Sequence, residues 1–251
     1  MTALVRSELS RATGRRLLWV LGGVAALGVT VLGVLTYLRT SADASVLDGT
    51  RVADTMKGTS GILALIGWVI GASLIGAEHQ SRGLTTTLTF VPSRSRVFAA
   101  KLAAAVSVSV AFAVVTLGLA LLAIVPAILA FGGTHAGDAS VLDVVGVALR
   151  GTLLVAAATA IGFALASVGR NTAAALGAGF AYLIVVEQIV GELFAGWRRW
   201  LLVGNAFVFV DGKASMEIAG RGPVGAGIFF GVVGATLAAG AAMAFRVRDV
   251  A

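Results

Sequence analysis

The sequence has few charged residues, few prolines and no cysteine. Only 12% of its 251 residues are charged and 58% are hydrophobic, whereas an average soluble domain carries about 25% charged residues. So few charges cannot cover the surface of a water-soluble fold of this size, which excludes a soluble enzyme. The lack of cysteine excludes disulfides, cysteine-ligated zinc and thiol nucleophiles. The composition therefore predicts an integral membrane protein.

Six runs of the sequence are long and apolar enough to cross a membrane as helices. A transmembrane helix needs about 20 mostly apolar residues. The runs are residues 17–38, 59–77, 102–127, 141–168, 172–190 and 224–245. They are continuously apolar, without the alternation of barrel strands. The predicted fold class is an all-α polytopic membrane protein with one permease-like domain over residues 1–251.

Lysine and arginine are unevenly divided between the two ends of these predicted spans. Eleven lie at the ends shared with the termini: Arg6, Arg11, Arg15, Arg16, Arg82, Arg94, Arg96, Lys101, Arg170, Arg246 and Arg248. Seven lie at the opposite ends: Arg39, Arg51, Lys57, Arg198, Arg199, Lys213 and Arg221. Because cytoplasmic loops carry the excess of cations, both termini are expected in the cytoplasm of a cell-membrane protein. The net charge of +7 is interpreted as part of this excess of cations at the cytoplasmic face, and no nucleic-acid partner is expected.

Residues 1–16 predict an amphipathic helix that lies in the membrane interface. Leu4, Val5, Leu9 and Ala12 line one side of such a helix, and the opposite side carries Arg6, Ser7, Ser10, Arg11 and Arg15. A simple positively charged anchor before the first span explains the same residues equally well. Both interpretations stay open at this point.

The connection between the second and third spans contains a short helical pattern. Leu84, Leu88 and Val91 recur at i, i+4 and i+7, which predicts a helix over residues 82–91 with one apolar face. Pro92 ends this helix. Arg94 and Lys101 follow, where they are expected to meet anionic lipid headgroups or an acidic partner.

The order of residues in this connection resembles the ABC-2-type permease family, the membrane subunits of ATP-driven exporters. The matching positions are Glu78, Gly83, Leu84, Leu88, Pro92, Arg94 and Lys101, with Gly-Leu in place of the usual Gly-Thr. The resemblance extends over the N-terminal stretch, the six spans and the long connection before the last span. In that family the short inner helix is a coupling helix that docks on a separate ATPase subunit. The resemblance therefore assigns docking to Glu78, Arg82, Gly83, Leu84, Leu88, Val91, Pro92 and Arg94, with the interfacial helix (Leu4, Val5, Leu9, Arg11) close by.

The same resemblance implies the partners and the function. It implies two ATPase subunits, a second permease subunit of the same or a related kind, and contact with membrane lipids. It also implies export of a hydrophobic or amphipathic substrate along a path between the two permeases. ATP and Mg²⁺ are expected only in the ATPase, because this chain lacks a P-loop: its one Gly-Lys pair, Gly212-Lys213, precedes alanine and has no upstream glycine at the required spacing. The chain itself is expected to bind no cofactor or metal and to be no enzyme.

Residues 191–223 predict a half-inserted outer segment. The stretch mixes apolar residues with glycines, and aromatic residues flank Arg198 and Arg199. Aromatic rings favour the headgroup level of a membrane, and arginine side chains extend toward water from there. The segment is too short and too charged to span.

Three ionisable residues fall within the predicted spans. Arg150 lies about nine residues into the fourth span, roughly 13 Å by helical rise, and Glu187 lies near the outer end of the fifth. The short turn between these spans makes them antiparallel neighbours, so Arg150 and Glu187 are expected to meet. Asp143, seven residues before Arg150, would join them. The cluster either fixes the register of two helices, which is favoured, or lines a substrate path.

The sequence argues against two other functions and contains one helix-packing signal. An ion-coupled secondary carrier needs acids near the membrane midplane, which these spans nearly lack. An intramembrane serine protease would need Ser60 and His79 together, but on one helix they lie about 28 Å apart. The pairs Gly67-xxx-Gly71 and Gly227-xxx-Gly231 predict close helix contacts, within the chain or at a dimer seam.

Overall fold

The computed structural model is an all-helical bundle. The structure describes residues 2–42, 49–81, 89, 93–131, 141–212 and 221–247. Within these ranges, six helices are long and apolar enough to cross a membrane. The predicted fold class, an all-α protein with six spans, is confirmed.

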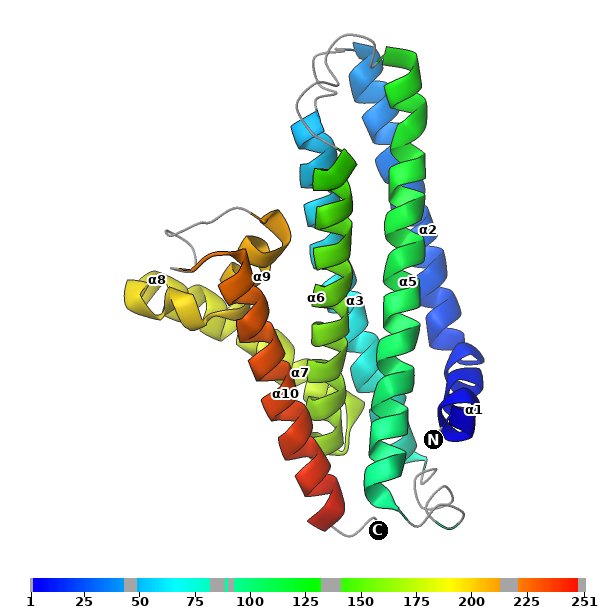
Figure 1. Ribbon diagram of the computed structural model, residues 1–251, viewed down its shortest axis with the longest axis vertical. Coiled ribbons are helices and arrows are strands. Elements are labelled where there is room, and N and C mark those ends of the chain that lie inside the picture. The colour runs from blue at the N-terminus through cyan, green and yellow to red at the C-terminus, as the bar shows by residue number, and fades with distance from the viewer. Residues whose placement is uncertain are drawn as a thin grey trace.

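In chain order the helices are α1 (Thr2–Thr13), α2 (Arg16–Ala42), α3 (Gly49–Gln80), α5 (Arg94–Phe131), α6 (Val141–Gly169), α7 (Thr172–Ala181), the π-helix η2 (Tyr182–Val190), α8 (Gly191–Leu193), the 3-10 helix η3 (Ala195–Trp200), α9 (Leu202–Asp211) and α10 (Pro223–Val247). In the bundle α2 lies beside α5 and α3 lies beside α6, so these neighbours in space are not neighbours in the chain (Figure 1). The fifth span consists of α7, η2 and α8 in direct succession. α1 and the last turn of α10 lie toward the same end of the bundle (Figure 1).

Two spans extend beyond their apolar runs. α3 begins at Gly49 rather than at residue 59, so Asp54 and Lys57 lie on a helix and not in a loop. These two side chains are 2.7 Å apart, one turn from each other, a spacing that stabilises a helix. α5 begins at Arg94 rather than at residue 102, which places Lys101 inside the helix. Apolar runs locate spans, but polar residues with local partners continue the helices past them.

The stretch between the fifth and sixth spans contains short helices instead of a span. η3 and α9 follow α8, and α9 covers ten residues. In Figure 1 these elements lie at the level where α10 begins, away from the end that carries α1. α9 packs on α10 through Phe209, whose ring centroid lies 6.5 Å from that of Phe230.

Glycines bring α3 and α6 into backbone contact along their length (Figure 1). A Cβ atom at Gly71 would overlap the carbonyl oxygen of Thr159, and one at Gly67 would lie 2.8 Å from the Thr159 hydroxyl. Gly162 of α6 meets Trp68 in the same way. Small residues allow such close approach of membrane helices. The first glycine pair therefore packs α3 on α6 within the chain. In the second pair Gly227 contacts Phe209, while Gly231 faces open space.

We expect Gly71→Ala to destabilise the folded chain by about 1–3 kcal/mol, because the added methyl group overpacks the α3–α6 contact. Gly61→Ala is the matched control on the same helix, since a Cβ there meets nothing within 4 Å. Alanine favours a helix over glycine by roughly 0.5–1 kcal/mol, so Gly61→Ala should keep or raise stability. Thermal unfolding of the purified chain in detergent measures both. Equal effects of the two substitutions would contradict the packing assigned to Gly71.

Candidate functional site: a buried charge cluster on the N-terminal helix

α1 carries an acidic residue in the middle of its buried face. Ala12 and Glu8 are buried, with Glu8 only 5% exposed, and Leu4, Val5 and Leu9 are half-buried. Four of the five polar residues expected to face outward, Arg6, Ser7, Ser10 and Arg11, are exposed. The fifth, Arg15, lies beyond the end of α1 and is bonded to α3 instead. α1 therefore lies with its apolar side against the bundle, and Glu8 points inward with that side.

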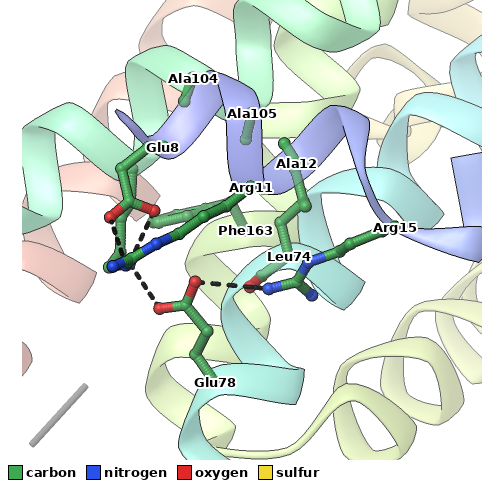
Figure 2. A pocket seen from close by; sticks show the side chains of 10 residues that line it. Glu8, Arg11, Ala12, Arg15, Leu74, Glu78, Ala104, Ala105 and Phe163 are labelled. Carbon is green, nitrogen blue, oxygen red and sulfur yellow. Dashed lines mark hydrogen bonds and ion pairs between the residues drawn. The ribbon is translucent and has the colours of Figure 1, made fainter. Parts of the chain in front are cut away.

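Lys101 of α5 joins α1 to α3. Its Nζ atom lies 2.8 Å from Glu8 Oε2 and 2.5 Å from Glu78 Oε2, and the lysine is 5% exposed. Figure 2 shows the carboxylates of Glu8 and Glu78 directed into the same pocket from α1 and α3. One ammonium group thus connects three helices.

Arg15 adds a second link between the N-terminal segment and α3. Its guanidinium lies 3.3 Å from Glu78 Oε1 (Figure 2). It also donates to the carbonyl oxygens of Ser73 and Leu74 at 3.1 and 3.2 Å. Arg15 stands between α1 and α2, so these bonds hold the turn into the first span against α3.

Glu8, Arg15, Glu78 and Lys101 are here called the inner charge cluster because they lie at the end of the bundle that carries α1. They comprise two acids and two cations. Buried ions are costly unless opposite charges compensate them, and this set is neutral. The pocket that they line has a volume of about 20 Å³, enough for about one water molecule. The inner charge cluster therefore joins helices to one another. The pocket that it lines is too small to bind a substrate.

Small and aromatic residues bring the helices close enough for these contacts. Ala104 and Ala105 line the same pocket on α5, which lets α1 approach. Beneath it the rings of Phe98 and Phe163 pack edge to face, with centroids 5.4 Å apart. The ring of Phe245 on α10 packs at a tilt against that of Phe98, with the centroids 5.7 Å apart. The rings of Phe98, Phe163 and Phe245 thus form an apolar cluster next to the inner charge cluster.

The inner charge cluster flanks the connection that the family resemblance assigns to docking. Glu78 lies in the last turn of α3 and Lys101 in the second turn of α5. The remaining predicted docking residues, Arg82, Gly83, Leu84, Leu88, Val91 and Pro92, lie outside the described residues. Arg94 begins α5 and donates to the carbonyl oxygen of Arg246, 3.3 Å away in the last turn of α10.

Sequence reasoning missed the partner of Lys101. The lysine was expected to meet lipid headgroups or an acidic partner protein, but it is buried between two acids of its own chain. The signal was present in the N-terminal helix. Glu8 stands four residues after Leu4 and four before Ala12, so it interrupts an apolar face at a position that requires a cation opposite.

The structure does not bring Asp143, Arg150 and Glu187 together. Among the ion pairs of the described residues, none joins any two of them. Asp143 is exposed in the first turn of α6. The Arg150 guanidinium lies against Gly212, and Glu187 accepts a hydrogen bond from Val203 N at 2.9 Å. The expected contact between Arg150 and Glu187 is therefore replaced by contacts of each with the segment around α9.

The described part of the chain offers no group of three or more His, Asp or Glu residues arranged to hold a metal ion. Ser60 and His79 also stay apart. The Ser60 hydroxyl donates to Met56 O at 2.7 Å, and His79 Nδ1 lies 3.0 Å from Ile75 O. Both residues therefore bond within α3, on turns that are far apart along the helix.

We expect Lys101→Met to destabilise the folded chain by about 3–5 kcal/mol, because Glu8 and Glu78 then lack a shared cation in a buried site. The double variant Glu8→Gln/Lys101→Met should recover part of this loss, since Arg15 still compensates Glu78. Arg11→Gln is the control: Arg11 bonds Glu8 at 3.3 Å from an exposed position, so its effect should stay within about 1 kcal/mol. Thermal unfolding in detergent measures all three. A loss for Arg11→Gln equal to that for Lys101→Met would contradict the role given to Lys101.

Comparison with known proteins agrees with the resemblance found in the sequence. The family described as ABC-2 family transporter protein matches residues 4–186, which include α1, the inner charge cluster and the first five spans up to Val186. A search of the curated proteins finds no match. Since the family match covers well over half of the 251 residues, the chain belongs to the ABC-2 family of transporter proteins.

Proposed function

We propose that this chain is the permease subunit of an exporter whose ATPase is a separate polypeptide. Membrane subunits of the ABC-2 family generally work with ATPase partners. The observation that supports the proposal most is the inner charge cluster, which ties α1 to both helices that flank the connection over residues 82–91. An ATPase docked on this connection would act on three helices at once.

The inner charge cluster suggests how movement of the ATPase subunits is passed to the membrane-spanning helices. Closure of two ATPase subunits would displace the ends of α3 and α5. Because Lys101 holds Glu8 and Glu78 together, α1 would move with them rather than stay in the interface. α3 is one uninterrupted helix of 32 residues packed on α6, so a shift at its inner end would reach its outer end.

A second permease subunit and a hydrophobic or amphipathic substrate complete the proposal. α2 exposes large apolar side chains along its length, including Trp19, Leu27 and Val34. A single chain leaves this surface to lipid, whereas two permeases facing each other would cover part of it and enclose a path with apolar walls. The transport direction is proposed to be outward, as in the exporters that the sequence resembles.

The orientation can be tested directly because the chain has no cysteine. Ser81→Cys, exposed after α3, should react with a membrane-impermeant maleimide only in inside-out vesicles. Ser41→Cys, exposed near the end of α2, should react only in intact cells. The opposite pattern would put residues 82–91 outside the cell and rule out docking of a cytoplasmic ATPase.

Docking is tested by purifying the tagged full-length chain from its native membrane. We expect a P-loop ATPase to co-purify and to hydrolyse ATP in the complex. Leu84→Asp/Leu88→Asp should lose the ATPase, because two charges disrupt the apolar face of the predicted coupling helix. Thr85→Asp/Thr89→Asp is the matched control on the opposite face and should retain it. Normal ATPase recovery with the leucine variant would contradict the docking face.

A further inference from the structure

Three arginines lie near one another at the level where α10 begins, on the face of the bundle opposite α1. Arg198 and Arg199 are in the last turn of η3, and Arg221 lies two residues before α10. α10 has 25 residues, a length of about 37 Å, which exceeds the hydrocarbon core and is shorter than the whole bilayer. Since Arg246 is in the last turn of α10, Arg221 lies at the headgroup level of the other face.

No carboxylate neutralises these cations within the part of the chain that the structure describes. None of the ion pairs there includes Arg198, Arg199 or Arg221. Glu192, the acid of the preceding helix α8, is exposed and belongs to none of them either. Arg221 also stands beside the positive end of the α10 dipole, and the first turn of α10 contains no acid. The charges therefore repel one another, and a bound anion would lower their energy.

Aromatic rings hold two of the guanidinium groups at one place. The Cζ atoms of Arg199 and Arg221 lie 5.6 and 5.2 Å from the centroid of the Trp200 ring. Arg221 also lies 5.0 Å from the Phe229 ring, whose centroid is 6.3 Å from that of Trp200. Cation–π contacts attract a guanidinium group to a ring face and leave its N–H groups able to donate. Trp200 therefore keeps two arginines together despite their like charge.

The backbone that carries Arg198 and Arg199 is fixed from the interior of the protein. Asn205 of α9 is buried, and its Nδ2 atom donates to the carbonyl oxygens of Arg199 and Leu201 at 3.0 and 2.7 Å. Arg198 Nε donates to Gly191 O at 2.8 Å, which orients this side chain through one of its three nitrogens. The arginines are thus positioned in advance, and such preorganisation lowers the entropy cost of binding a ligand.

η3 also presents aromatic rings beside the arginines. Residues i and i+3 share a face of a 3-10 helix, so Trp197 and Trp200 lie on one side of η3. Both are exposed, at 62% and 54%, and Phe194, three residues earlier, is exposed as well. Tryptophan rings favour the boundary between hydrocarbon and headgroups. A ligand that matches this surface therefore needs both an anionic group and a hydrocarbon chain.

We propose that η3 and the start of α10 bind the phosphate group of an anionic phospholipid through Arg199 and Arg221, with Arg198 at the edge of the site. Guanidinium groups bind phosphate oxygens through paired N–H donors, and Trp197 and Trp200 pack on the upper acyl chains. A phosphatidylcholine headgroup fits less well, because its own cation is repelled by the arginines. The site goes beyond the proposed function, since a lipid bound there holds the connection before α10 at the headgroup level without any ATPase.

The test compares two lipids at a fluorescent probe on η3. Gly196→Cys introduces a single cysteine at an exposed position where a Cβ atom meets nothing within 4 Å. The full-length chain, labelled there with bimane, is reconstituted in phosphatidylcholine vesicles. These contain small amounts of phosphatidylglycerol or phosphatidylcholine with a nitroxide near the top of the acyl chain. We expect phosphatidylglycerol to quench the probe at a concentration roughly twentyfold lower, because each arginine adds to the attraction.

Three variants locate the site. Arg199→Gln and Arg221→Gln should each reduce the preference for phosphatidylglycerol by roughly three- to fivefold. Trp200→Leu changes no charge but should also reduce the preference, because the two arginines lose the ring that keeps them together. Arg39→Gln is the matched control. It removes an exposed arginine from the last turn of α2 and should leave the preference unchanged.

A second probe and a soluble competitor decide the outcome. With bimane on Ser81→Cys, exposed after α3, Arg199→Gln and Arg221→Gln should not alter quenching. Equal loss at both probes would overturn the proposal, since the substitutions would then disturb the whole fold. Equal quenching by both lipids at Gly196→Cys would overturn it too, as would a preference that Trp200→Leu leaves unchanged. Loss of the preference in millimolar inorganic phosphate would likewise overturn it, because the arginines would then hold a free anion instead of a lipid.

Discussion

An ammonium group buried between two carboxylates determines how the N-terminal half of this protein is assembled. Lys101 is only 5% exposed in its position under α1, so it is stable there only while Glu8 and Glu78 face it. This requirement sets the rotation of α1, the depth of the last turn of α3 and the start of α5 together. The three helices therefore behave as one mechanical unit at the end of the bundle where α1 lies.

The α3–α6 contact adds stiffness to that unit. Glycine removes the side chains that would separate two helices, so backbone meets backbone at Gly67, Gly71 and Gly162. Close packing of this kind resists bending and sliding, because any shift produces overlap. In the proposed transport cycle, a force applied at the inner charge cluster would therefore be transmitted along the α3–α6 pair.

Much of the fold could be predicted from the sequence, and the reasons for the failures are physical. Runs of apolar residues identify spans because hydrocarbon tolerates little else, and all six were found. The polar first turns of α3 were missed because Lys57 is stabilised by Asp54 and Asp211, and the latter pairing is not visible in local hydropathy. Arg150 and Glu187 were placed on neighbouring spans correctly, but a helix from elsewhere in the chain lies between their charges. Knowing that two spans are neighbours does not reveal that another helix lies between two of their side chains.

The π-helix in the fifth span has a geometric consequence for the chain that follows it. Residues five apart, such as Tyr182 and Glu187, would point in directions about 140° apart on an ordinary α-helix with 3.6 residues per turn. The wider turn of a π-helix bonds residues i and i+5 and so brings these two side chains toward one side, where both accept hydrogen bonds from consecutive amides, Leu202 N and Val203 N. The extra residue in this turn thus places two side-chain acceptors where they bind two consecutive backbone amides of α9. On an ordinary α-helix the two acceptors would share a face only if one residue between them were deleted, because residues i and i+4, not i and i+5, are neighbours there.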